Sequence, residues 1–260
     1  MRMRIFAGLS NRSTIPLVGY LALFTFVAWL ACNPSNRKDI RDYYFPLKKL
    51  TDGLVYEYQP VGQDSLSPAF WYYRSFIQED GIYLTGTYYE YDLIPLQLVR
   101  EEMVSNGMLL QDLFLYLPDS NGRQERLAAE VLVGNVFPFS VGDSSGIFLY
   151  KVKFDLPNEM GRTTTLIKNR RYLGETKYEF QGETYDAIRF EVRELIEDVS
   201  VTEGSIEPQF DGEEIYALDL GLVYYKKNLG GQTIAYELAD RYSMEQLEQT
   251  AKKRLNTIDQ

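Results

Sequence analysis

Apolar and polar positions alternate over most of this chain. From residue 54 to about residue 241, segments rich in Tyr, Phe, Trp and branched aliphatic residues follow one another with only short turn sequences between them. Such segments are typical of β-strands, and their direct succession predicts an antiparallel meander. Asn106-Gly107 separates two of them and is a strong hairpin signal, because both residues tolerate positive φ.

The predicted strands are of two kinds. In residues 185–193, apolar and charged side chains alternate, so one face of this strand should contact water. Residues 70–77 and 108–117 are apolar on both faces and need cover on both sides. A flat sheet does not supply that cover. We therefore expect an all-β fold, with a strongly curved antiparallel sheet or a half-barrel.

A C-terminal helix is predicted from Ser243 to about Asn256. Ser243 and Gln246 fit a capping box at its start. Apolar residues then recur at helical spacing on one face, namely Met244, Leu247, Ala251 and Leu255. We expect this face to dock on the same domain, and contact with a partner protein is the alternative.

The N-terminal region has the order of a secretory signal. Residues 17–31 carry no charge, and they follow Arg2, Arg4 and Arg12 without any acidic residue. A basic start, a short apolar run and a small residue before the cut are typical of a signal peptide. An uncleaved membrane helix over residues 15–32 is the alternative, since its length is near the lower limit for a span.

The end of the apolar run resembles the lipobox of bacterial lipoproteins. Apolar Leu30 and small Ala31 precede Cys32, the only cysteine of the chain, although Trp29 stands where the family prefers an aliphatic residue. The resemblance implies cleavage before Cys32, acyl chains on that cysteine, and membrane anchoring through them. Residues 1–31 would then be the signal, residues 32–42 a lipidated tether, and residues 43–260 a single β domain.

The residue after the cysteine bears on the destination. Asn33 is not the aspartate that retains some lipoproteins at the inner membrane, so the resemblance implies the outer membrane. With either a cleaved signal or an uncleaved helix, we expect the domain to lie outside the cytoplasm.

Composition excludes several kinds of chemistry. The leader contains three of the 27 basic residues and none of the 37 acidic ones, so the remaining chain carries a formal charge of about −13. Such a chain repels phosphate backbones, and we expect no nucleic-acid partner. The absence of histidine and of a free thiol excludes His-based triads, Cys-His nucleophiles and the usual zinc sites. No metal or other cofactor is predicted.

Two later segments carry a second resemblance. Residues 178–190 form a predicted hairpin with Gly182 at its turn, and residues 213–224 follow with the sequence Glu-Glu-Ile-Tyr-Ala-Leu-Asp-Leu-Gly-Leu-Val-Tyr. Together they resemble the closing section of periplasmic half-barrel proteins of the outer-membrane lipoprotein carrier and receptor type, in which a late strand reads aromatic-Ala and then Gly-aliphatic-Val. The resemblance implies a fold and a compartment and leaves function open.

Aromatic side chains are the first candidate for function. On a curved sheet they could line a groove for a lipid, an acyl chain or a hydrophobic peptide, and the candidates are Trp71, Tyr73, Tyr83 and Phe114. Ordinary core packing is the alternative reading of each of them.

Charged side chains give weaker candidates. Lys168, Arg170 and Arg171 form the densest basic patch, which either contacts a phosphate or lipid headgroup or solubilises an exposed strand. The adjacent acids Glu101-Glu102 and Glu213-Glu214 cannot converge within a pair, because neighbouring residues of a strand point to opposite faces. We interpret them as solvated strand edges.

The sequence thus favours a membrane-anchored, non-enzymatic envelope lipoprotein that binds or carries an apolar ligand on its curved sheet. A structural subunit of an envelope complex is the first alternative. A carboxylate-based hydrolase, built from acids distant in sequence, is the second.

Overall fold

The computed structural model describes residues 37–63, 65–119, 122–142, 147–156 and 161–258. Residues 37–260 form one compact unit, distinct from residues 1–36. Cys32 and the whole predicted signal lie outside the described residues, so cleavage and lipidation stay predictions. In the described part of the chain, no helix combines the length and the hydropathy needed to cross a bilayer.

The described chain is built almost entirely of strands. Two short 3₁₀ helices, η1 (Arg41–Tyr43) and η2 (Leu47–Lys49), precede the main sheet, and α2 (Met244–Ile258) follows it. The strands are β1 (Lys38–Asp39), β2 (Leu54–Pro60), β3 (Ala69–Ile77), β4 (Ile82–Tyr89), β5 (Pro95–Val104), β6 (Gly107–Pro118), β7 (Gln124–Pro138), β8 (Ser140–Val141), β9 (Phe148–Asp155), β10 (Arg162–Phe180), β11 (Glu183–Ser200), β12 (Gly204–Ile206), β13 (Gln209–Ala217), β14 (Gly221–Leu229) and β15 (Gln232–Tyr242).

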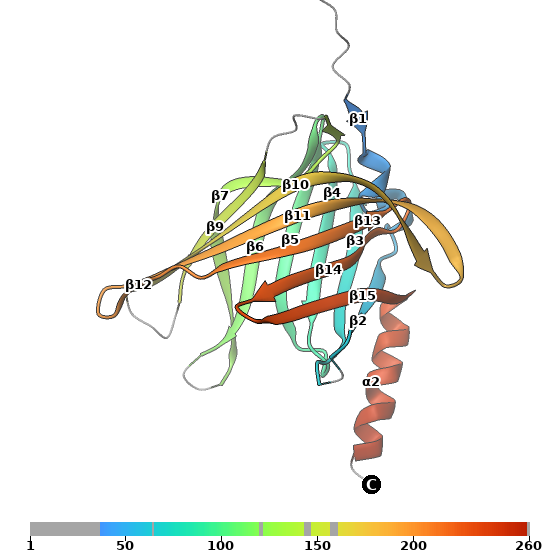
Figure 1. Ribbon diagram of the computed structural model, residues 1–260. Coiled ribbons are helices and arrows are strands. Elements are labelled where there is room, and N and C mark those ends of the chain that lie inside the picture. The colour runs from blue at the N-terminus through green and yellow to red at the C-terminus, as the bar shows by residue number, and fades with distance from the viewer. Residues whose placement is uncertain (1–36, 64, 120–121, 143–146, 157–160, 259–260) are drawn as a thin grey trace, which may run out of the picture. The chain divides into compact units, whose positions relative to one another are not determined.

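Twelve of these strands close into an antiparallel barrel (Figure 1). Their order is β10-β9-β7-β6-β5-β4-β3-β2-β15-β14-β13-β11, and β11 returns to β10. The expected all-β antiparallel fold with a C-terminal helix is confirmed. The sheet goes beyond a half-barrel because β10 is long enough to pair with β9 over Thr163–Arg170 and with β11 along its whole length.

Closure explains the strands that are apolar on both faces. Their inward side chains fill the barrel, where Tyr56, Tyr58 and Phe190 are fully buried. On the outside of β2 and β3, Val55 and Phe70 are also fully buried, because Leu247 of α2 packs against them. Both faces of these strands are therefore withdrawn from water.

The N-terminal plug, residues 40–50, fills one end of the barrel. Ile40 and Leu50 are fully buried, and the ring of Phe45 lies 4.1 Å from that of Tyr73. Backbone hydrogen bonds hold the plug, since the Ile40 amide donates to the Phe139 carbonyl at 2.9 Å and the Ser75 amide to the Leu50 carbonyl at 2.9 Å. The folded domain therefore begins before the boundary expected at residue 43.

The start of α2 has the predicted cap. The Ser243 amide donates to Oε1 of Gln246 at 2.9 Å, and the Gln246 amide donates to the Ser243 hydroxyl at 3.3 Å. Leu247 and Ala251 are buried on the barrel side. The helix thus docks on its own domain, as expected, while the Leu255 side chain lies outside the part of the chain that is described.

Candidate functional site

A cavity of about 550 Å³ occupies the interior of the barrel. Its size lies within the range of small-molecule binding sites, roughly 300 to 1,000 Å³. Tyr44 and Phe45 of the plug close its floor, and inward-facing side chains of the barrel strands form its walls. Alternation along each strand thus turns one face of the sheet into the lining of a site.

One wall of the cavity is aromatic. The Trp71 ring stacks on Tyr88, with centroids 5.3 Å apart and planes at 24°, and it lies parallel to Tyr73 at 5.8 Å. Gly86 makes room for this arrangement, because a Cβ there would come within 2.8 Å of Cε1 of Tyr73. These stacked rings offer a flat apolar surface to anything held in the cavity.

The facing wall is charged. Arg170 on β10 forms a two-point ion pair with Glu214 on β13, with Nε to Oε2 at 2.7 Å and Nη2 to Oε1 at 3.3 Å. Nη1 of Arg170 donates to the Val136 carbonyl at 3.1 Å. Lys168 lies one step along the same inward face, with Nζ 2.7 Å from Glu214 and 3.1 Å from Glu194 on β11.

Mutual charge keeps this network ionised. Burial alone would raise the pKa of the Glu214 carboxyl, but the charges of Arg170 and Lys168 reverse this and hold the pKa far below its ordinary value. Burial likewise works against Glu194, and Lys168 and Lys227 together bring its pKa below the ordinary value. The wall therefore presents fixed charges in a partly buried setting.

Glu101 on β5 behaves differently. Burial raises its pKa from 4.5 to about 7, although a hydrogen bond from the Tyr44 hydroxyl and the charge of Arg170 oppose the rise. The phenol groups of Tyr73, Tyr150 and Tyr216 also interact with this carboxyl, and burial raises the pKa of each of them. Glu101 is thus the cavity group that changes charge near neutral pH.

The cavity opens at the end opposite the plug. Side-chain exposure falls along the charged wall from 39% at Lys227 to 20% at Lys168 and 8% at Arg170. Lys227 lies near the C-terminal end of β14, whereas Gly221 at the start of the same strand packs against the Phe45 ring of the plug. A ligand would therefore enter past Lys227 and meet Lys168 before Arg170.

Two of the four predicted aromatic residues line this cavity. Trp71 and Tyr73 do, and their proposed role in ligand contact stays a prediction. Tyr83 pairs with Phe76, which lies on the opposite face of β3 from Trp71, so the Tyr83 ring lies on the outside of the barrel. The expected place of Tyr83 in the groove was wrong, because Phe76 is five positions along β3 from Trp71 and an odd offset puts the two side chains on opposite faces.

Phe114 also lies on the outside, against the guanidinium of Arg126 at 4.7 Å. Simple alternation would give it the same face as Met108 and Leu110. A bulge in β6 intervenes, because Arg100 pairs with Asp112 while the next residue, Glu101, pairs with Leu110. The extra residue reverses the alternation and points Phe114 outward.

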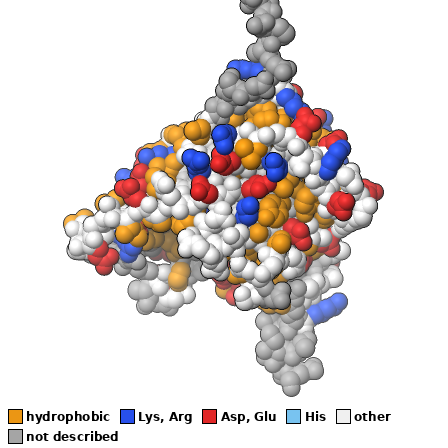
Figure 2. Space-filling view, in the orientation of Figure 1, with side chains coloured by type: hydrophobic (Ala, Val, Ile, Leu, Met, Phe, Trp, Pro, Cys, Tyr) orange, Lys and Arg blue, Asp and Glu red, His pale blue; other side chains and the backbone are white. Residues whose placement is uncertain are grey.

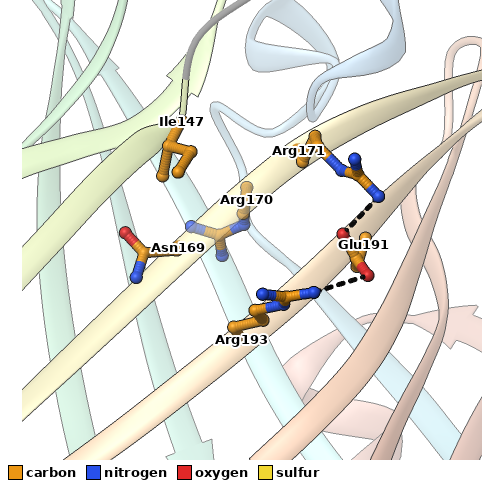
Figure 3. A pocket seen from close by; sticks show the side chains of 6 residues that line it. All are labelled: Ile147, Asn169, Arg170, Arg171, Glu191 and Arg193. Carbon is orange, nitrogen blue, oxygen red and sulfur yellow. Dashed lines mark ion pairs between the residues drawn. The ribbon is translucent and has the colours of Figure 1, made fainter.

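The basic patch is divided between two sides of the wall. Lys168 and Arg170 point into the cavity, so the interpretation as solubilising surface charge is wrong for them. Arg171 points outward and pairs with Glu191 at 2.8 Å. A depression of about 170 Å³ lies there, and Figure 3 shows Glu191 between Arg171 and Arg193.

The outer face of this wall is otherwise balanced in charge. Figure 2 shows basic and acidic side chains interspersed over it. The pairs include Arg189 with Glu213 at 3.8 Å and Lys226 with Glu213 at 3.5 Å. This side carries solvated ion pairs of the ordinary kind.

Three acidic residues of the cavity were not among the predicted site residues. Glu101, Glu194 and Glu214 line the cavity, whereas the pairs Glu101-Glu102 and Glu213-Glu214 were read as solvated edges. Only one acid of each adjacent pair points inward, as expected for neighbouring residues of a strand. A signal was present for Glu194, which shares a strand face with Phe190 and Val192. In the described residues, no group of three or more acidic side chains is arranged to hold a metal ion.

Comparison with solved structures finds distant likenesses. A candidate lipoprotein from Parabacteroides distasonis superposes with a TM-score of 0.48 at 12% identity, covering 77% of this chain and 98% of the other. A candidate exported protein with a YmcC-like fold from Bacteroides fragilis gives 0.49 at 10% identity, covering 77% and 99%. No protein-family model matches the sequence, and the curated proteins gave no match.

Proposed function

We propose that this protein is an envelope lipoprotein that binds one apolar or amphiphilic small molecule inside its barrel. The observation that carries the proposal is the cavity of about 550 Å³ with a stacked aromatic wall at Trp71, Tyr73 and Tyr88. Pockets that hold small molecules are mostly apolar with a few placed polar groups, and this lining has that character.

The carboxylates favour binding over hydrolysis. Glu214 is held by Arg170 and Lys168, and Glu194 by Lys168 and Lys227. Glu101 accepts a hydrogen bond from Tyr44. A two-carboxylate hydrolase needs an acid and a base that both exchange protons with substrate. Glu101 has a pKa of about 7, but Glu194 and Glu214 are each held ionised by two cations and leave it without a second such acid among the described lining residues. We therefore propose a non-enzymatic role.

The position of the lipid anchor favours exchange of the ligand with a component other than the membrane that holds the protein. Cys32 precedes Lys38 of β1 by six residues, which span roughly 20 Å when fully extended. β1 leads directly into the plug, at the closed end of the barrel. In this proposal the lipidated end holds the closed end near the membrane, and the ligand passes through the opening to another envelope component.

Fluorescence of Trp71 tests the proposal. The chain has two tryptophans, Trp29 and Trp71, so a β-domain covering residues 33–260 contains Trp71 alone. Because residues 37–260 form a separate compact unit, this β-domain is expected to fold without the leader, which a cooperative unfolding transition would verify.

Dodecanol and N-phenylnaphthylamine are suitable apolar probes for that titration. Either one should change Trp71 emission with saturation, and Val99→Trp should abolish binding of N-phenylnaphthylamine because Val99 lines the cavity opposite Gly86. Saturable binding that survives in the Val99→Trp variant, or no binding of any probe to the wild type, would contradict the proposal.

A further inference from the structure

The ion pairs of the charged wall contain unequal numbers of cations and acids. Three cations, namely Lys168, Arg170 and Lys227, share two acids, namely Glu194 and Glu214. Of the other charged residues at the cavity, Lys226 pairs with Glu213 on the outer face and Glu101 accepts a hydrogen bond from Tyr44. This positive excess lies inside a chain with a net charge of −10. An interior that opposes the sign of the whole molecule favours an anionic guest over a cationic one.

The deepest cation is not available to a ligand. Arg170 uses Nε and Nη2 on Glu214 and Nη1 on the Val136 carbonyl. It therefore serves to hold Glu214 and the wall in place. Recognition of an anion has to come from the cations nearer the opening.

Lys168 and Lys227 are those cations. Both ammonium groups contact the Glu194 carboxylate, Lys168 at 3.1 Å. Each ammonium carries three donors, and the contacts with acids use two on Lys168 and one on Lys227. Unused donors thus remain on two adjacent cations at the mouth of the cavity.

We propose that the ligand is an amphiphile whose anionic end group binds between Lys168 and Lys227, while its apolar part lies against Trp71, Tyr73 and Tyr88. This inference rests on the proposed function and adds the class of ligand. A carboxylate and a phosphate monoester share the required chemistry, since both present several acceptor oxygens to ammonium groups.

The external depression does not offer the same site. Arg171 and Arg193 flank Glu191 there, but their side chains are 58% and 67% exposed. Charges that exposed are screened by water and salt, and no apolar wall accompanies them. The interior pair combines partial burial with an adjacent aromatic surface.

The structure also assigns opposite effects to two neighbouring substitutions. Lys227→Gln removes a cation that the anion would contact, at a position exposed enough to tolerate change. Glu194→Gln removes the carboxylate that competes for the same ammonium groups. The first should weaken binding of an anion and the second should strengthen it, while a neutral ligand of equal length should respond to neither.

The experiment measures displacement of N-phenylnaphthylamine from the β-domain by dodecanoate, dodecyl phosphate and dodecanol at pH 7.5 and fixed ionic strength. We expect at least one of the two anions to bind tenfold or more tightly than dodecanol. Lys227→Gln should lower the affinity for that anion about tenfold, and Glu194→Gln should raise it several-fold. The affinity for dodecanol should be unchanged in both variants. Lys153→Gln, exposed on β9 and outside the lining, is the matched control and should change nothing.

The outcomes separate the two proposals. If dodecanol binds as tightly as both anions, or if Lys227→Gln weakens all three alike, the anion site is overturned while the apolar-ligand proposal stands. If no compound displaces the probe and the probe itself does not bind, both fail. If an anion binds more tightly than dodecanol, the tighter of dodecanoate and dodecyl phosphate identifies the preferred end group.

Discussion

Arg170 and Glu214 form a two-point ion pair on one wall of the barrel interior, with Nε 2.7 Å from Oε2. Their strands, β10 and β13, lie on either side of β11, and the pairing of both with β11 brings the two side chains together. Tyr216 donates a further hydrogen bond to Glu214 at 3.1 Å. Removal of Glu214 would leave the buried Arg170 without its carboxylate, and removal of Arg170 would leave Glu214 with Lys168 as its remaining cation.

We predict that Arg170→Met and Glu214→Gln each lower the free energy of unfolding by about 3 to 5 kcal/mol, because each removes one partner of a buried ion pair. The double substitution Arg170→Met with Glu214→Leu should cost clearly less than the sum of the two. Urea denaturation measures all three. The matched control is Arg171→Gln, whose exposed pair with Glu191 is worth at most about 1 kcal/mol. Equal losses of unfolding free energy in Arg170→Met and Arg171→Gln would contradict the stabilising role of the buried ion pair.

The second prediction concerns pH. Because the pKa of Glu101 rises to about 7 on folding, the native state binds a proton more tightly than the unfolded state between pH 4.5 and 7. Stability should therefore fall as pH rises through this window, by roughly 3 kcal/mol in total, and then level off. The chain has no histidine to titrate in the same range.

Glu101→Gln should remove this slope and leave the variant more stable than the wild type above pH 7. Glu194 and Glu214, whose pKa values are lowered, affect stability at lower pH. The stability that they add is complete above pH 4.5 and is lost only in acid. Glu102→Gln, the next residue on the outer face, is the control. Unfolding free energies measured from pH 5 to 8 would refute the assignment if Glu101→Gln kept the wild-type slope.

The third prediction separates a docked helix from a partner-binding one. Leu247 is buried against Val55 and Phe70, so Leu247→Ala should lower stability by about 2 to 5 kcal/mol through the cavity it leaves. Gln249→Ala, exposed on the same helix, should change stability by less than about 0.5 kcal/mol. Thermal and urea unfolding would both report the difference, and identical stability of the two variants would contradict docking.

The fourth prediction concerns the anchor. Intact mass of the membrane-extracted protein should correspond to a chain that begins at Cys32 and carries acyl chains, and Cys32→Ala should abolish both processing and acylation. A wild-type chain of full length would instead make residues 15–32 a membrane helix and remove the tether from the account.

The strands themselves were predictable from the sequence. Asn106-Gly107 marked the turn between β5 and β6, the apolar residues 108–117 match β6 to within one residue at each end, and Ser243 and Gln246 indicated the capping box of α2. These features depend on local patterns. Closure of the sheet depends on the pairing of β2 with β15, two strands from opposite ends of the domain, which no local pattern specifies.

The site was harder to predict for the same reason. A single bulged residue in β6 reversed the faces beyond it, so Phe114 points outward although its spacing from Leu110 indicated the inner face. Lys168 and Arg170 looked like surface charge because their counter-charges, Glu194 and Glu214, come from other strands. A buried ion pair leaves no trace in the sequence near either partner.

The claim that most needs testing is that the barrel interior holds a small molecule. Native mass spectrometry of the β-domain, after incubation with a lipid extract of the cells that make the protein, tests it directly. We predict one additional bound molecule per chain, absent from the Val99→Trp variant whose cavity is filled. A wild-type spectrum that contains only the unliganded chain, or the same bound mass in the filled variant, would contradict the account.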